Sequence, residues 1–158
     1  MAGDSAGAGL TMSLLLALRN GHDPLPGSAL LMSPWVDLSG ATQRQPDEAP
    51  GADEAPIVVS PAVIQRFAEL YLGGHPMDDP LLAPLATDLR GLPPILVQAA
   101  TGDSLAPEAR LLVERCREAG IDVTLELYPV PTHDFHVFWS FLPEAADAVQ
   151  RAGEFLNR

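Results

Sequence analysis

The sequence Gly3-Asp4-Ser5-Ala6-Gly7 is a G-x-S-x-G pentapeptide, and an alanine- and leucine-rich stretch follows it directly. In this motif the serine sits on a sharp turn between a strand and a helix, which exposes its hydroxyl. Glycines suit the turn because its backbone is strained and a Cβ would clash with neighbouring chain. The motif therefore predicts a nucleophilic serine, Ser5, at the start of a helix. A strand should precede the turn, although only Met1 and Ala2 precede the motif here.

Helical and strand patterns alternate along the rest of the chain. Continuous apolar runs, typical of buried parallel strands, occur at 29–36 and 95–99, whereas 123–128 alternates and indicates an edge strand with one face in solvent. Helices are predicted at 6–20, 61–72, 107–119 and 143–156. Alternating strands and helices predict an α/β fold with a parallel sheet of about three strands flanked by helices.

Two segments between these elements read as loops. Residues 40–56 are rich in glycine, proline and acidic side chains, which favours a flexible loop. Residues 79–85 contain two prolines and predict an ordered loop without regular structure. We treat residues 1–158 as one domain, because the length suits a single hydrophobic core.

Bulk composition excludes several classes of function. The net charge is −12 with only 9 lysines and arginines, which argues against a nucleic-acid partner. The one cysteine, Cys116, excludes an internal disulfide and lies in a helical pattern typical of a packed thiol. No apolar run approaches the length of a membrane span, and no secretory signal pattern opens the sequence, so we expect a cytoplasmic protein without a membrane span.

A serine nucleophile needs a base to accept its proton and a carboxylate to orient that base. Asp103 comes shortly after the predicted strand 95–99, and His133 comes after the predicted strand 123–128. Sites in open α/β sheets are built at the carboxyl ends of the strands. We therefore expect Ser5, Asp103 and His133 to meet as a catalytic triad.

Each neighbouring polar residue has a simpler interpretation. Asp103 could also cap the helix at 107–119 or form an Asx turn with Gly102. His136 lies among apolar residues and is expected to be packed, whereas the pattern places the other two histidines, His22 and His75, in solvent. Asp4 and Asp134 are expected to have structural or supporting polar roles. No histidines, cysteines or carboxylates show ligand spacing, so no metal site is expected.

Several segments together resemble the hormone-sensitive-lipase-like esterases, a branch of the α/β-hydrolases. The pentapeptide at 3–7 is typical of the nucleophile turn in that family. The remaining segments that carry the resemblance are LMSPWVDL at 31–38, YLGG at 71–74, DPLLAPL at 79–85, GLPPILVQ at 91–98, DSL at 103–105 and HDF at 133–135. The likeness covers essentially the whole chain.

This resemblance implies a serine hydrolase mechanism. Ser5 would be the nucleophile, His133 the general base and acid, Asp103 the orienting carboxylate, and the Ala6 N–H one donor to the oxyanion. Typical substrates would be short acyl esters, including p-nitrophenyl esters, and no cofactor is implied. The chain would correspond to the C-terminal half of such an enzyme, without its first strands, its N-terminal cap and its His-Gly-Gly loop.

Three functional hypotheses follow. The chain is an active carboxylesterase, or a non-catalytic or weakly active half-domain that self-associates or complements another chain, or a serine hydrolase for another acyl substrate such as a peptide or lactone. We also expect a homo-oligomer, because the missing strands would leave the strand at 29–36 with an unpaired edge and apolar faces exposed.

Overall fold

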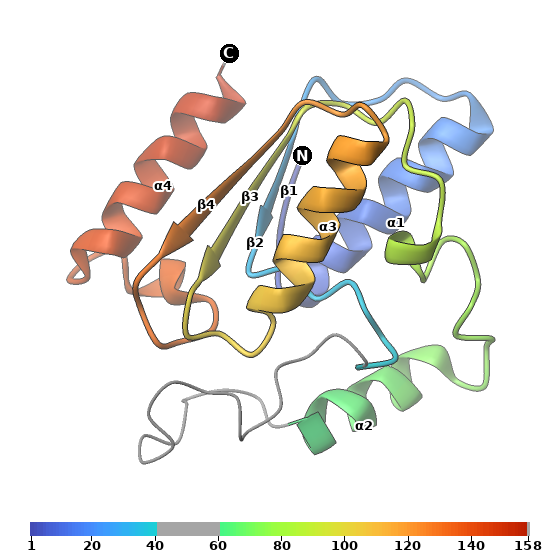
Figure 1. Ribbon diagram of the computed structural model, residues 1–158, viewed down its shortest axis with the longest axis horizontal. Coiled ribbons are helices and arrows are strands. Elements are labelled where there is room, and N and C mark those ends of the chain that lie inside the picture. Colours follow the sequence, from blue (N-terminus) through green and yellow to red (C-terminus); the bar gives the residue numbers. More distant parts are fainter. Residues whose placement is uncertain (41–60, 158) are drawn as a thin grey trace.

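The computed structural model describes residues 1–40 and 61–157, and it contains a parallel four-stranded sheet. Its strands are β1 (Ala2–Asp4), β2 (Ala29–Met32), β3 (Ile95–Ala100) and β4 (Val123–Tyr128), which lie side by side in the order β1-β2-β3-β4 (Figure 1). The predicted α/β class with a parallel sheet flanked by helices is confirmed. The sheet has one strand more than the sequence patterns indicated, since β1 supplies the strand expected before the pentapeptide.

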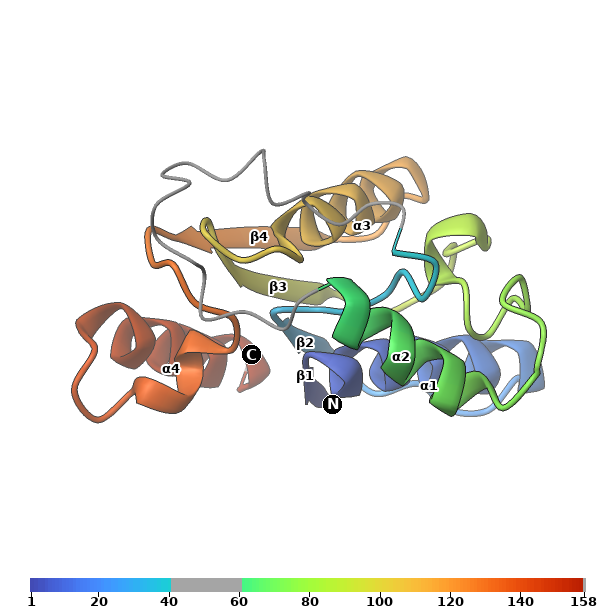
Figure 2. The same cartoon turned by 90° about the horizontal axis from the view of Figure 1, so that it is seen from below.

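Helices cover both faces of this sheet (Figure 2). The α-helices are α1 (Ala6–Gly21), α2 (Pro61–Leu72), α3 (Ala106–Glu118) and α4 (Pro143–Leu156), and the 3-10 helices are η2 (Pro84–Ala86) and η3 (Phe135–Phe138). Side chains of α1 and α3 share one large buried cluster with one face of the sheet, whereas α4 packs on the opposite face.

The alternation of side chains along the strands decides which helix each residue meets. Leu31 of β2 and Val97 of β3 are buried against α1 and α3, and their neighbours Leu30 and Leu96 are buried against Phe155 of α4. Successive residues of a strand point to opposite faces, so a strand covered on both faces is apolar at most of its positions. The continuous apolar runs at β2 and β3 are explained in this way.

The structure corrects two expectations about the strand predicted at 29–36. The strand expected over 29–36 ends at Met32, because Ser33 adopts φ 43° and turns the chain before Pro34. β2 pairs with β1 as well as β3, so among residues 1–40 and 61–157 the outermost strand on that side is β1 and not the strand at 29–36.

The loop predictions have different outcomes. The predicted flexible loop at 40–56 lies, apart from Gly40, outside the described residues. The proline-dense segment at 79–85 is mainly turns, and η2 begins within it at Pro84. β4 ends the strand order, as predicted for an edge strand.

Two expectations from composition can also be compared with the structure. No helix among residues 1–40 and 61–157 combines the length and the apolar character needed to cross a membrane. Cys116 is fully buried on α3, and burial raises the pKa of its thiol to about 12. The prediction of a packed thiol is confirmed.

Candidate active site

Ser5 occupies the tight turn between β1 and α1. Its backbone lies at φ 50° and ψ −119°, and its N–H donates to the Met32 carbonyl at 2.9 Å. The Ser5 carbonyl accepts from Ala8 N at 3.1 Å and from Trp35 N at 3.1 Å, which joins the start of α1 to the segment after β2. A Cβ on Gly3 would collide with the Gly7 carbonyl, so the first glycine permits this close passage. The hydrogen bonds of the Ser5 N–H and carbonyl therefore hold the strained turn against the end of β2 and the segment after it.

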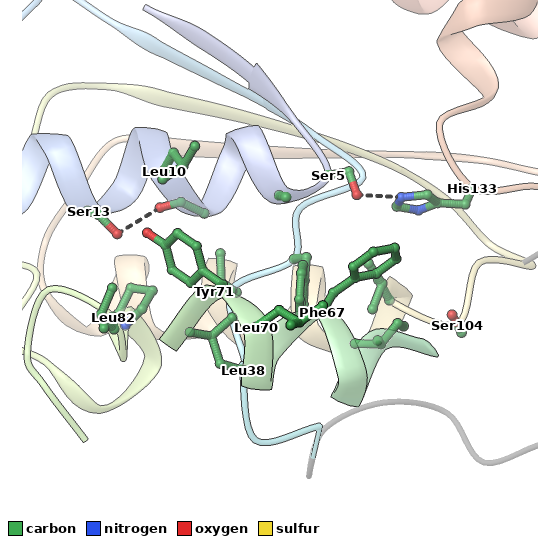
Figure 3. Close-up of a pocket in the computed structure, with 17 residues that line it drawn as sticks. Ser5, Leu10, Ser13, Leu38, Phe67, Leu70, Tyr71, Leu82, Ser104 and His133 are labelled. Atoms are coloured by element: carbon green, nitrogen blue, oxygen red, sulfur yellow. Dashed lines mark hydrogen bonds between the residues drawn. The ribbon is translucent and has the colours of Figure 1, made fainter. Parts of the chain in front are cut away.

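The structure brings the three predicted site residues together in one hydrogen-bonded chain. His133 Nε2 lies 2.7 Å from Ser5 Oγ, and His133 Nδ1 lies 2.8 Å from Asp103 Oδ2 (Figure 3 shows the Ser5–His133 contact). Asp103 is fully buried, and the His133 side chain is only 11% exposed. Each residue follows the carboxyl end of a different strand, so parallel pairing of β1 to β4 sets their spacing.

Asp103 also forms the local turn that the sequence left as an alternative. Its Oδ1 accepts from the Leu105 N–H at 3.0 Å, which is an Asx turn leading into α3, while Oδ2 faces the histidine. Gly102 lets this loop approach the loop after β4, because a Cβ there would lie 2.6 Å from Pro131 Cα. The carboxylate is therefore held by its own backbone and cannot rotate freely away from His133.

Opposing effects set the pKa of His133. Burial lowers the pKa, but the hydrogen bond and charge of Asp103, with the charges of Asp134 and Asp4, raise it above the ordinary histidine value. Burial also raises the pKa of the Asp134 carboxyl to about 6, against the lowering effect of His133. The site thus concentrates negative charge around one imidazole, which favours its protonated form.

Ser5 and His133 face an apolar cavity of about 610 Å³. In Figure 3 these two residues lie at one end of the lining, and Ser13 and Leu82 lie at the other. Gly9 and Leu10 of α1, Trp35, Leu38, and Phe67, Leu70 and Tyr71 of α2 form much of the wall. An apolar wall with few polar groups, close to a hydroxyl and an imidazole, suits a neutral organic substrate.

Ala6, the predicted oxyanion donor, begins α1 and lines the cavity directly after Ser5. A helix supplies no acceptor to the N–H groups of its first turn, so such groups are free to bind a developing negative charge. The Ala6 N–H is therefore a candidate oxyanion donor.

Glu108 is a site-supporting residue that the sequence analysis missed. It is fully buried on α3, and its Oε2 accepts from the N–H groups of Val36 and Asp37 at 2.8 and 2.9 Å. This carboxylate holds the segment after β2 that carries Trp35 into the cavity wall. The sequence does contain one indication of this role. Glu108 is an acidic residue on the same helical face as the apolar residues Leu112 and Cys116.

The remaining polar residues follow their simpler interpretations. His136 is buried against Phe135, with ring centroids 4.0 Å apart, and burial lowers its pKa to about 4. His75 is exposed and pairs with Asp79 at 2.8 Å, and His22 is exposed. Within the described residues no three histidine, cysteine or carboxylate side chains are grouped as metal ligands.

Comparisons with known proteins identify the fold family of this chain. Residues 1–137 match a family model described as an alpha/beta hydrolase fold. An acetyl-hydrolase from Streptomyces hygroscopicus is 41% identical over 161 residues, a match that covers 99% of this chain and 51% of the relative. A crystal structure of an esterase from the bacterial hormone-sensitive lipase family is 39% identical with a TM-score of 0.86, and the match covers 98% of this chain and 51% of that one.

A second solved structure, of EstE5 soaked by p-nitrophenyl butyrate, is 32% identical with a TM-score of 0.87, covering 98% of this chain and 51% of that one. The chain spans about half the length of the relatives it matches. The similarity is continuous over the strands, turns and loops that carry Ser5, Asp103 and His133. The chain therefore belongs to the α/β-hydrolase fold family and is similar, within it, to the esterases of the hormone-sensitive lipase group.

Proposed function

We propose that this chain hydrolyses carboxylic esters through an acyl-enzyme formed on Ser5. The observation that carries the proposal is the continuous contact from Ser5 Oγ to His133 to the buried Asp103, opening into an apolar cavity. Supporting it, the relatives named above are described as an acetyl-hydrolase and as esterases.

The proposed reaction moves one proton through His133. Ser5 Oγ attacks the ester carbonyl carbon while its proton passes to Nε2, and Asp103 holds the Nδ1–H throughout. The tetrahedral intermediate collapses as the imidazolium returns the proton to the leaving alcohol, which leaves an acyl group on Ser5. Water then repeats the sequence on the acyl-enzyme, releasing the acid and restoring the serine.

The Ala6 N–H is proposed as one donor to the oxyanion that forms on the carbonyl oxygen. It follows the nucleophile directly, and a donor in that position stabilises the charge that develops in the transition state. The apolar cavity offers few groups that could pair with a charged or strongly polar substrate, which supports neutral esters. The proposal of short-chain acyl esters follows from the resemblance to the hormone-sensitive-lipase-like esterases. Other acyl substrates, such as lactones, remain the alternative that substrate profiling distinguishes.

Covalent labelling tests the proposal directly. The purified protein is incubated with a fluorophosphonate, digested, and analysed by mass spectrometry, with p-nitrophenyl butyrate hydrolysis followed in parallel. We expect one phosphonylated residue, Ser5, and loss of hydrolysis in proportion to labelling. Hydrolysis that continues with Ser5 unlabelled would refute the assignment. Absence of both labelling and hydrolysis would favour the non-catalytic half-domain.

Hydrolysis should rise with pH and then level off. Only neutral His133 can accept the serine proton, and its pKa is raised above the ordinary histidine value by Asp103 despite burial. The base is therefore lost as the pH falls through this raised pKa, and the acidic limb should lie on the neutral side of the usual histidine range. A pH series of kcat/KM measures the limb. A rate that increased toward acid would require a different base.

We also propose that the chain self-associates as a homo-oligomer. Large apolar side chains are exposed on α1, at Leu10 and Leu14, and beside η3, where Trp139 and Phe141 are 61% and 75% exposed. Burying such surface stabilises association by about 25 cal/mol per Å². We expect a dimer or larger assembly with an interface above roughly 1,000 Å².

Sedimentation velocity over a dilution series measures this assembly. Activity assayed at the same concentrations should fall as the oligomer dissociates. Val63 is exposed on α2 and lies outside the proposed patches. The Val63→Ser variant should therefore sediment like the parent. A fully active monomer at micromolar concentration would contradict the proposal.

A further inference from the structure

Asp134 brings a second carboxylate to the imidazole of His133. Its Oδ2 lies 3.3 Å from His133 Nε2, the same nitrogen that contacts Ser5 Oγ at 2.7 Å. Asp103 meanwhile occupies the opposite ring nitrogen. The imidazole therefore has a carboxylate at each nitrogen, although the family resemblance assigns only one of them.

The backbone aims Asp134 at this position. It lies at φ 48°, in the left-handed region that aspartate tolerates better than most residues, and its N–H donates to Ser33 Oγ at 3.3 Å. Ser33 is fully buried and has φ 43°, so two strained residues from neighbouring loops hold each other. Rotation of Asp134 out of the left-handed region would break this contact and carry its carboxylate away from the ring.

The contact discriminates between the two protonation states of His133. Neutral imidazole with its proton on Nδ1 presents a lone pair at Nε2, and an ionised carboxylate offers nothing to donate to it. Imidazolium carries an N–H at Nε2, which a carboxylate can accept. Asp134 is poorly hydrated, since its side chain is 25% exposed and its Oδ1 is buried without a hydrogen-bond partner among the described residues. Its charge is therefore weakly screened at this distance.

We propose that Asp134 is a positioning residue that stabilises the imidazolium form of His133 through its carboxylate at Nε2. During ester hydrolysis this form exists after Ser5 transfers its proton and before the leaving alcohol receives it. The inference rests on the proposed function for its role in turnover, but the contact itself can be measured without turnover.

Two other carboxylates and one histidine also affect the charge of His133. Asp103 follows β3 and Asp4 ends β1, and both favour the protonated ring, whereas the neighbouring His136 disfavours it when charged. Burial keeps His136 neutral above about pH 4, so it contributes no charge near neutral pH. Asp134 itself is ionised above about pH 6, so its effect is present where the enzyme would work.

The test is a histidine NMR titration of the full chain carrying Asp134→Asn or Asp134→Gly. Asparagine keeps the shape, and both residues tolerate φ 48°, so the left-handed backbone is retained. The chain has four histidines, and replacing His133 by glutamine in the parent identifies its signal. We expect the His133 midpoint to fall by about one pH unit in both variants, as for loss of a close opposite charge.

The matched control is Asp78→Asn, which removes the same charge from an exposed loop residue. Its His133 midpoint should equal that of the parent. Buried His136 reports in the same spectra that the fold is intact, because its signal should not titrate near neutral pH. A His133 midpoint unchanged in both folded Asp134 variants would overturn the inference.

Kinetics separates positioning from a general structural role. In the Asp134 variants the acidic limb of kcat/KM for p-nitrophenyl butyrate should move down by the same pH interval as the NMR midpoint. A uniform loss of rate at every pH, with no movement of the limb, would contradict the inference. A lowered NMR midpoint supports it even if no ester is hydrolysed, in which case the proposed function alone has failed.

Discussion

Replacing Ser5 by alanine is expected to reduce p-nitrophenyl butyrate hydrolysis by about 10⁵- to 10⁶-fold, to the level left by binding and oxyanion contacts. The side chain removed is the proposed nucleophile, and His133 Nε2 loses the hydroxyl that it contacts at 2.7 Å. No bulk is added at a turn where Ser5 already adopts φ 50°. Initial rates across a range of enzyme concentrations measure the effect, with phosphonate titration giving the fraction of active sites.

The control is Ser104→Ala, because Ser104 lines the same cavity and its hydroxyl has no hydrogen-bond partner among the described residues. This variant should keep the parent's rate within a few-fold and should still be labelled at Ser5. If Ser5→Ala and Ser104→Ala retained equal activity, the hydrolysis would come from another residue or from a contaminant. The role proposed for Ser5 would then be abandoned.

Replacing Asp103 by asparagine is expected to lower kcat by about 10⁴-fold, as the loss of an orienting carboxylate does in other serine hydrolases. The asparagine oxygen can still accept from the Leu105 N–H, so the turn into α3 is preserved. The amide N–H₂, however, would donate to His133 Nδ1 and move the ring proton to Nε2. The histidine would then present an N–H to Ser5 and could not accept its proton.

Two measurements accompany the Asp103 variant. Urea unfolding should show stability close to that of the parent, which separates the catalytic effect from misfolding. The pKa of His133 should fall, because the side chain that raises it most has lost its charge. Activity within tenfold of the parent would mean that another carboxylate orients the ring.

The proximity of Ser5, Asp103 and His133 could be predicted, because their positions depend on topology rather than on detailed packing. Asp103 and His133 each follow a strand whose pattern is plain in the sequence, and parallel strands bring their carboxyl ends to one edge. The nucleophile lies in a motif whose glycines have a local steric reason. A residue placed shortly after a strand can move little relative to the sheet. The order of strands and polar residues along the chain was therefore sufficient to predict that the three side chains lie together.

The features that the sequence could not show depend on contacts between distant segments. β1 has three residues, too few for any periodicity, and is defined by its pairing with β2. In the sequence Glu108 looks like a solvent-exposed glutamate of a helix. Only the structure shows that its Oε2 accepts hydrogen bonds from the N–H groups of Val36 and Asp37. Asp134 contacts Nε2 through a left-handed backbone conformation, which side-chain identity alone does not specify.

The shortness of β1 has a consequence for the dynamics of the protein. Ser5 follows a strand held by three residue pairs to β2, whereas Asp103 and His133 follow strands joined by six pairs. Local opening of a strand with few pairs needs far less free energy than global unfolding. Amide hydrogen exchange should therefore be faster in β1 than in β3. Ser5 would be displaced during these local openings while β3 and β4 stay paired. The lifetime of its contact with His133 would then be set by the β1–β2 pairing rather than by the global stability of the fold.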